Sequence, residues 1–140
     1  MSDLQKKLRA LGLEIVWQTP ERLIVWSEAA RKEFSDADET RQNRILAVCR
    51  LWCDGHNLTT EQHNRNERRA QRGKINKRME AFKTHKVRLY GYERALFGKR
   101  TFVAVACDPQ KKSNRAKDRI LTVALGRIVD LEEHIGDGND

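Results

Sequence analysis

The residues best suited to chemistry lie next to one another between positions 85 and 90. The period-two alternation of a strand places Lys86, Arg88 and Tyr90 on one face and the two apolar residues between them on the other. The planar guanidinium of Arg88 fits phosphate oxygens better than a lysine does. His85 comes just before, and an imidazole with an ordinary pKa of about 6.5 exchanges protons at neutral pH. The segment therefore predicts a face that binds a phosphate and transfers a proton.

Two further residues are expected to approach the same face, and a third to stack on a base. Lys111 and Lys112 follow the next apolar strand, and Tyr92, like Tyr90, is suited to stacking on a base. Each residue also has an ordinary structural explanation. Tyrosines pack at sheet edges, an exposed strand arginine pairs with a carboxylate, a loop histidine lies at the surface, and lysines solvate a turn. Both interpretations stay open from the sequence.

Basic residues concentrate in the middle of the chain. The 140 residues carry 28 Lys and Arg against 20 Asp and Glu, a net charge of +8, and residues 61–100 alone hold 13 basic and 4 acidic side chains. Such a segment attracts polyanions, so we expect a nucleic acid as partner, although a solvated face or a docking site for an acidic protein has the same composition. The expected RNA-binding residues are Arg68, Arg69, Arg72, Lys74, Lys77, Lys83, Lys86, Tyr92, Arg94, Arg100 and Arg115.

The chain has the length of a single domain, spanning residues 1–140. No apolar run reaches the ~18 residues of a membrane helix, and the first residues lack an apolar signal region, so we expect a cytoplasmic protein that does not contact a membrane. The three cysteines lack paired spacing, and the four histidines are scattered without a carboxylate or cysteine constellation. This pattern predicts no metal and no cofactor.

The first half of the chain predicts two strands and three helices. A short helix is expected from leucines at helical spacing, before β-branched runs at 13–17 and 22–26 that predict strands. Ser27 is a good helix N-cap. After an interruption, another helix carries an apolar stripe from Ile45 to Trp52. These two helices are expected to form a hairpin or one kinked rod.

The second half contains a polar segment and further strands. Residues 56–74 nearly lack large apolar side chains, which predicts an exposed basic helix or a mobile loop. A helical stripe at 75–82 follows, then strands at 86–90 and 101–107, the latter in the centre of the sheet, and an amphipathic C-terminal helix. We therefore expect an α+β fold in which a small, mainly antiparallel sheet packs on one side against an N-terminal helix pair and the C-terminal helix.

Three stretches of the chain carry a family pattern. From residue 82 it reads Phe-Lys-Thr-His-Lys-Val-Arg-Leu-Tyr-Gly, and from residue 100 Arg-Thr-Phe-Val-Ala-Val-Ala-Cys-Asp-Pro-Gln-Lys-Lys. Upstream, from residue 25, it reads Val-Trp-Ser-Glu-Ala-Ala-Arg-Lys. Together they resemble the RelE/ParE toxin superfamily, particularly HigB-like and phage-type members, over roughly residues 22–131. The resemblance implies a RelE-like fold, with residues 1–21 as an extension and a basic polar segment at 56–74 that is long for the family.

The resemblance implies the toxin of a type II toxin-antitoxin pair that cleaves messenger RNA on the ribosome. Its partners would be mRNA, the ribosome and a cognate antitoxin. Metal-independent attack by a 2′-hydroxyl needs a base, cations for the developing phosphorane charge and an acid for the leaving oxygen. Under this hypothesis the catalytic residues are His85, Arg88, Tyr90, Lys111 and Lys112. ParE-like members inhibit DNA gyrase instead, and a non-catalytic RNA-binding module needs only the basic segment, so both alternatives stay open.

Overall fold

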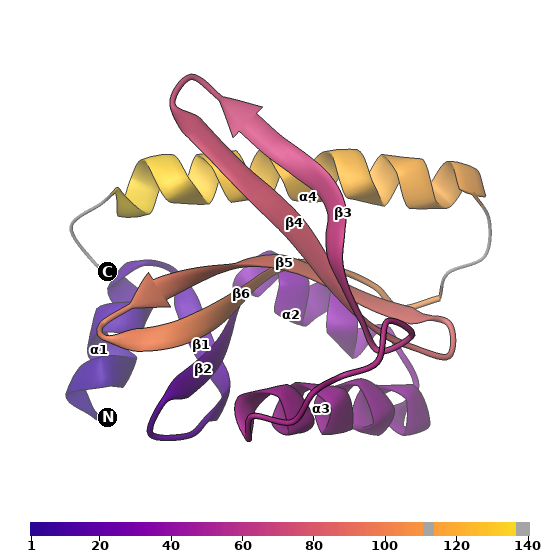
Figure 1. Cartoon of the computed structure of the whole chain (residues 1–140), viewed down its shortest axis with the longest axis horizontal. Coiled ribbons are helices and arrows are strands. Elements are labelled where there is room, and N and C mark those ends of the chain that lie inside the picture. The colour runs from indigo at the N-terminus through magenta and orange to yellow at the C-terminus, as the bar shows by residue number, and fades with distance from the viewer. Residues whose placement is uncertain (111–113, 137–140) are drawn as a thin grey trace.

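The computed structural model in Figure 1 describes residues 1–110 and 114–136, and the side chains of all of these except 114–117. Within these ranges no helix is long and apolar enough to cross a membrane. The expected helices at both ends of the chain, the helix pair after Ser27 and the strands near 13–26 are confirmed. In order, the elements are α1 (Asp3–Ala10), β1 (Leu13–Gln18), β2 (Arg22–Ser27), α2 (Glu28–Ser35), α3 (Glu39–Cys53), β3 (His63–Arg72), β4 (Ile75–Thr84), β5 (Val87–Leu96), β6 (Lys99–Asp108) and α4 (Asn114–Ile135).

The six strands form one sheet in the order β1-β2-β6-β5-β4-β3. Neighbouring strands are antiparallel except β2 and β6, which run parallel, so the predicted mainly antiparallel α+β architecture is confirmed. The sheet is nevertheless larger than the small RelE-like sheet that the sequence led us to expect. The apolar run predicted as the central strand lies in β6, an inner strand. A bulge between Tyr90 and Gly91 shifts the register of β5 against β6. Glycine is required there because a Cβ would lie 2.2 Å from the carbonyl oxygen of Val103.

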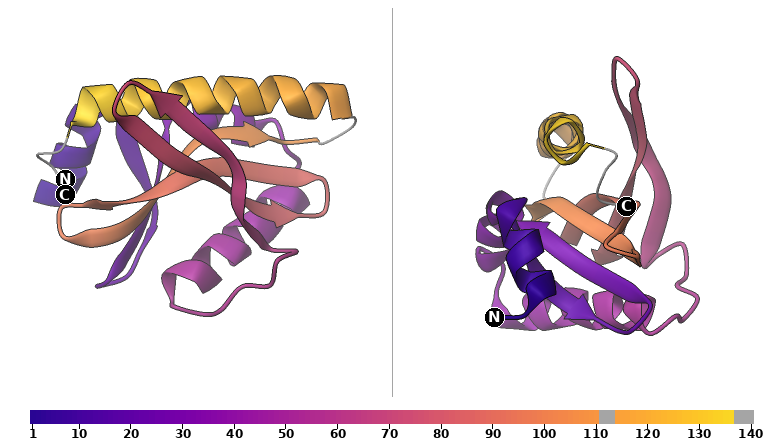
Figure 2. Two further views of the ribbon diagram at one scale, coloured as in Figure 1. Left: turned by 45° about the horizontal axis from the view of Figure 1, so that its top comes forward. Right: turned by 90° about the vertical axis from the view of Figure 1, so that its left-hand side faces the viewer.

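Helices cover both faces of the sheet, so the expectation of helices on one side is wrong. Leu121, Ala124 and Ile128 of α4 pack on one face, called the α4 face, together with α1. Ile45 and Trp52 of α3 pack on the opposite face, called the α3 face, together with α2. Figure 2 shows α4 and α3 on opposite sides of the sheet. The physical reason is that β6 is apolar on both sides along most of its length, and such a strand must be covered twice.

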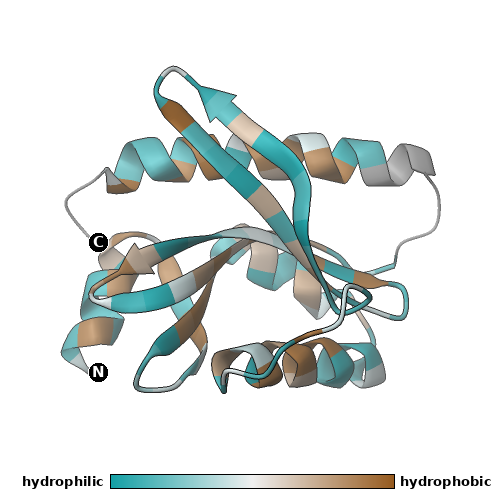
Figure 3. Ribbon diagram, in the orientation of Figure 1, coloured by the Kyte–Doolittle hydropathy of each residue, from teal (hydrophilic) through white to brown (hydrophobic). Residues whose placement is uncertain are grey.

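The basic segment also differs from its prediction. Residues 63–72 form strand β3 rather than a helix or loop, and the expected helical stripe at 75–82 is strand β4. Gly73, with a φ of +58°, closes the hairpin between them. Backbone pairing with β4 determines this strand, although its side chains are almost all hydrophilic (Figure 3). The hydropathy pattern therefore could not reveal it.

Helix α4 neutralises one side of this hairpin. Arg68 lies 2.7 Å from Asp118, and Arg72 lies 2.7 Å from Asp130 and 3.3 Å from Glu133. These ion pairs hold arginines of β3 against carboxylates of α4. Part of the positive charge counted in the sequence is thus balanced within the chain.

Candidate acid-base site

The predicted catalytic face does not form. His85 and Lys86 lie in the exposed turn between β4 and β5, and Lys86 adopts a φ of +60° rather than a strand conformation. Arg88 is half-buried and donates hydrogen bonds to the carbonyl oxygens of Thr84, at 2.6 Å, and Val87, at 3.0 Å. Tyr90 is fully buried against α4 instead of lying at an open surface. The strand has no solvated face here because both sides of the sheet are covered.

Several predicted RNA-binding residues bind carboxylates of the chain itself. The hydroxyl of Tyr92 donates to Glu132 at 2.6 Å, and Arg94 donates to the same carboxylate at 2.6 Å. Lys77 approaches Glu132 at 3.3 Å, and the side chain of Glu132 is 7% exposed. Burial, with the adjacent carboxylate, also raises the pKa of Tyr92. These three residues therefore anchor β4 and β5 to α4.

The remaining predicted residues are dispersed. Arg69 donates to Asn76 at 3.0 Å on the exposed side of the hairpin, and Lys74 is exposed in the hairpin turn. Lys111 and Lys112 lie outside the described residues, as does the side chain of Arg115. Among the remaining residues whose side chains the structure describes, Lys83 and Arg100 lie beside a concentration of titratable groups.

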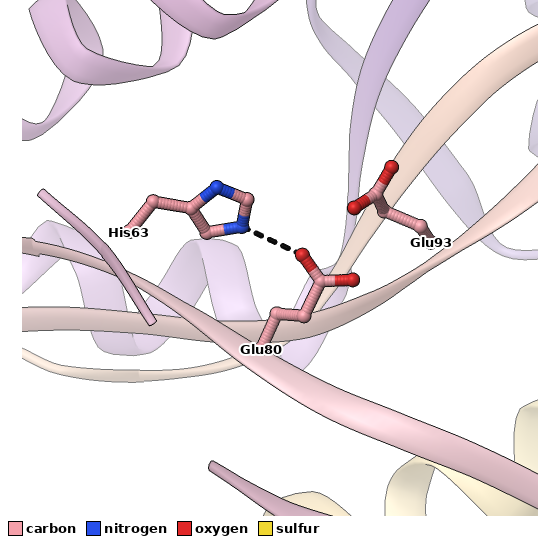
Figure 4. A group of neighbouring side chains, drawn as sticks. All are labelled: His63, Glu80 and Glu93. Carbon is pink, nitrogen blue, oxygen red and sulfur yellow. Dashed lines mark hydrogen bonds and ion pairs between the residues drawn. The ribbon is translucent and has the colours of Figure 1, made fainter. Parts of the chain in front are cut away.

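That concentration is a row of polar side chains crossing five neighbouring strands on the α3 face. We call it the polar row, and it consists of Arg22 of β2, Arg100 of β6, Glu93 of β5, Glu80 of β4 and His63 of β3. Nε2 of His63 lies 2.6 Å from Glu80, Glu80 hydrogen-bonds Glu93, and Arg100 donates to Glu93 at 2.7 Å. Figure 4 shows the imidazole and the two carboxyl groups turned toward one another.

The two carboxyl groups in the polar row have opposite proton affinities. Burial raises the pKa of Glu80, and the hydrogen bond and charge of Glu93 raise it further. Burial alone would also raise the pKa of Glu93, but hydrogen bonds with Glu80 and Arg100 lower it overall. Glu80 is therefore the carboxyl that holds a proton and Glu93 the one that is ionised. Pairs whose environments separate their pKa values in this way are typical of acid-base sites.

His63 connects the polar row to the surface. Its ring packs against Phe82 with centroids 4.8 Å apart, and burial lowers its pKa to about 4, which keeps the imidazole neutral at neutral pH. The second ring nitrogen points away from Glu80 (Figure 4). His63 also lines an open hollow of about 630 Å³ together with Leu58, Thr60, Glu61, Asn64, Arg65 and Lys83. We call this space the His63 hollow, and two cations share it with the imidazole.

The histidines are scattered in the sequence, but the fold brings His63 close to two carboxyl groups. Atoms of His63, Glu80 and Glu93 that could bind a metal all lie within 4.8 Å of one another. However, the 2.6 Å contact between His63 and Glu80 leaves no space for an ion between them. The carboxylate of Glu93 already accepts a hydrogen bond from Arg100. Positive charge from Arg65, Arg100 and Lys83 also acts on His63. The arrangement therefore fits a shared proton better than a cation.

Sequence reasoning missed this site because its members are separated in the chain. One signal was present, since Glu80 stands between the apolar residues Met79 and Ala81 in a segment that buries both. A buried carboxyl in such a run requires a partner.

Comparison with protein-family models, with curated proteins and with solved structures finds no match for this chain. Its membership of the RelE/ParE superfamily therefore stays a prediction from the sequence.

Proposed function

We propose that this protein cleaves RNA by attack of a ribose 2′-hydroxyl on the neighbouring phosphate, in the His63 hollow. The observation that carries the proposal is that a neutral imidazole, a guanidinium and an ammonium group line one open hollow: His63, Arg65 and Lys83. A base and two cations are what this reaction requires. The carboxyl pair behind the imidazole completes the site.

The proton of the 2′-hydroxyl moves to Nδ1 of His63. In the protonation state that we assign, Glu80 donates its own proton to Glu93 and accepts one from Nε2 of His63, which leaves Nδ1 as the acceptor. Glu80 would thus orient the imidazole as the carboxylate behind the histidine does in a catalytic triad. The negative charge that Glu80 and Glu93 share stabilises the imidazolium when it forms, although His63 is buried.

Arg65 and Lys83 bind the reacting phosphate. As the oxygen-phosphorus bond from the 2′-oxygen forms and the bond to the 5′-oxygen breaks, both cations balance the charge on the phosphorane. Lys83 gives a proton to the leaving 5′-oxygen, so the products are a 2′,3′-cyclic phosphate and a free 5′-hydroxyl. Solvent returns one proton to Lys83 and removes one from His63.

The biological setting of the proposal rests on the sequence resemblance. A RelE/ParE-like toxin would act on messenger RNA at the ribosome and would be neutralised by a cognate antitoxin. The catalytic residues we propose, however, differ from the expected set, which was His85, Arg88, Tyr90, Lys111 and Lys112. Gyrase inhibition and RNA binding without cleavage remain the two alternatives.

The test compares His63→Gln with His56→Gln. His56 is an exposed histidine in the loop before β3 and does not line the hollow, so it is a matched control. New RNA ends are mapped after incubation with ribosomes and message, and each variant is checked by thermal unfolding. We expect His63→Gln to lower the cleavage rate by about 10² to 10⁴-fold and His56→Gln to leave it unchanged.

Three other results would redirect the proposal. Equal cleavage by a folded His63→Gln protein would move the chemistry away from the hollow. Tight RNA binding without cleavage by the parent protein would favour the RNA-binding module. Inhibition of gyrase supercoiling, without any RNA cleavage, would favour the ParE-like alternative.

A further inference from the structure

The opposite end of the polar row carries two arginines over a buried aromatic ring. Arg22 and Arg100 are direct neighbours in register on the parallel strands β2 and β6. Their guanidinium carbons lie 4.9 and 5.5 Å from the ring centroid of Trp52, which itself is 1% exposed. We call this arrangement the arginine pair. It lies four strands from His63, a distance of about 19 Å at normal strand spacing.

Both guanidinium groups are fixed in place. Arg22 donates to the carbonyl oxygen of Trp52 at 2.8 Å, at the C-terminal end of α3. Arg100 donates to Glu93 at 2.7 Å, which connects the arginine pair to the acid-base site. Beneath them Trp52 packs against Phe82 and Phe102 at centroid distances of 5.9 and 6.4 Å. The ring therefore cannot move away, and the guanidinium groups are held over it.

This geometry favours one kind of ligand. Some of the N–H groups that would grip a phosphate are already used by Glu93 and by the Trp52 carbonyl. The side chain of Arg100 is still 47% exposed although its guanidinium lies over the ring of Trp52, so a ligand can reach this side chain from solvent. Unpaired bases of RNA stack on guanidinium planes as they do on aromatic rings. A base in a duplex is covered by its neighbours and could not do so.

We propose that the arginine pair is a stacking platform for one unpaired base of a single-stranded RNA whose reacting phosphate lies in the His63 hollow. The proposal rests on the proposed function for its substrate, but it does not depend on cleavage. It assigns the substrate class as single-stranded rather than duplex RNA. It also predicts that the chain crosses the sheet along the polar row, from β3 to β2.

The experiment measures binding of a 2′-O-methyl single-stranded RNA, which lacks the attacking hydroxyl. One abasic site is moved along the oligonucleotide, and affinity is measured for the parent protein and for Arg22→Lys, which keeps the charge but loses the planar group. Arg22 does not contact Glu93 in the described structure, so this variant spares the acid-base site. Arg50→Lys is the matched control, because Arg50 lies 4.6 Å from the ring centroid of Trp17, outside the polar row.

For the parent protein, we expect the abasic site to reduce affinity about tenfold at one position and little elsewhere. Arg22→Lys should lose that position dependence and Arg50→Lys should keep it, with all variants equally stable. The platform is overturned if no position responds, if Arg22→Lys retains the response, or if the single strand does not bind. A position-dependent response in a protein that cannot cleave natural RNA would reject the proposed chemistry and retain the platform.

Discussion

The two faces of the β3–β4 hairpin are both basic, yet their arginines have different surroundings. On the α4 face, Arg68 and Arg72 pair with carboxylates of α4. On the α3 face, Arg65 lines an open hollow beside His63, next to a buried carboxyl pair. One face uses its charge to attach the hairpin to the body of the protein. The other leaves its charge available to a ligand, so the local net charge alone does not identify a binding surface.

The largest expected effect tests the anchoring role of the α4 face. Replacing Glu132 with Leu removes a buried carboxylate that accepts hydrogen bonds from Tyr92 and Arg94. Removing one partner of a buried ion pair typically costs about 3–5 kcal/mol, so the free energy of unfolding should fall by that amount in urea titrations. A loss below about 1 kcal/mol would show that the hairpin is not held by this contact.

Glu80→Gln, by contrast, should change the free energy of unfolding little at neutral pH, because an amide resembles the protonated carboxyl.

The second prediction compares RNA affinity between the faces. Arg65→Ala combined with Lys83→Ala should weaken binding of single-stranded RNA by roughly a hundredfold or more, since each charge-assisted hydrogen bond contributes about 1.5–3 kcal/mol. The slope of log affinity against log salt should become shallower by about 1.4, or about 0.7 for each phosphate that the variant no longer binds. Arg68→Ala combined with Arg72→Ala should change both quantities less. The reverse order would mean that RNA binds the α4 face.

The third prediction concerns pH. Because folding raises the pKa of Glu80, the folded protein retains a proton that the unfolded chain loses above its ordinary pKa of about 4.3. Stability therefore falls as pH rises toward the pKa of the folded state, by at most about 1.4 kcal/mol per pH unit. Glu80→Gln should remove this dependence.

Thermal unfolding at pH 7 to 9 gives the cleanest comparison for this variant. Folding lowers the pKa of His63 and of Glu93, so these two groups reduce the stability of the protein when the pH falls. They do not contribute to a change in stability between pH 7 and 9. Parallel curves for the parent and Glu80→Gln across this range would mean that Glu80 is already ionised in the folded protein.

The smallest effect is expected for the single ion pair between Arg68 and Asp118. These side chains are 41% and 70% exposed, so solvent and salt screen their attraction. A double-mutant cycle with alanine at both positions should give a coupling energy of about 0.2–1 kcal/mol, which decreases with added salt. A coupling well above this range would show that hairpin attachment depends on individual surface pairs rather than on the buried carboxylate of Glu132.

Prediction from the sequence succeeded where the spacing of apolar residues within a single helix or strand indicates that element. The stripe from Ile45 to Trp52 has helical spacing, and it is buried in α3 as expected. The β-branched run of β2 and the apolar run of β6 likewise identified strands, and the expected inner position of β6 is confirmed. In each case the pattern of buried residues can be recognised within one short stretch of the chain.

Prediction failed where a property depends on several elements at once. Strand β3 has few apolar residues, so only its pairing with β4 and its contacts with α4 define it. The face expected at Lys86, Arg88 and Tyr90 does not form because α4 covers that side of the sheet. Alternation places residues on opposite sides of a strand, but it cannot say whether a side is solvated.

The sequence by itself determined that this is an α+β domain with a basic middle segment and an apolar inner strand, because composition and periodicity are local properties. Only the tertiary structure decided which charges are neutralised and which surround a site. His63, Glu80, Glu93, Arg100 and Arg22 come from five strands, and their order along the row follows the order of strands in the sheet rather than their order in the chain. Hydrogen bonding between neighbouring strands brings them into contact, and burial then separates the proton affinities of the two carboxyl groups.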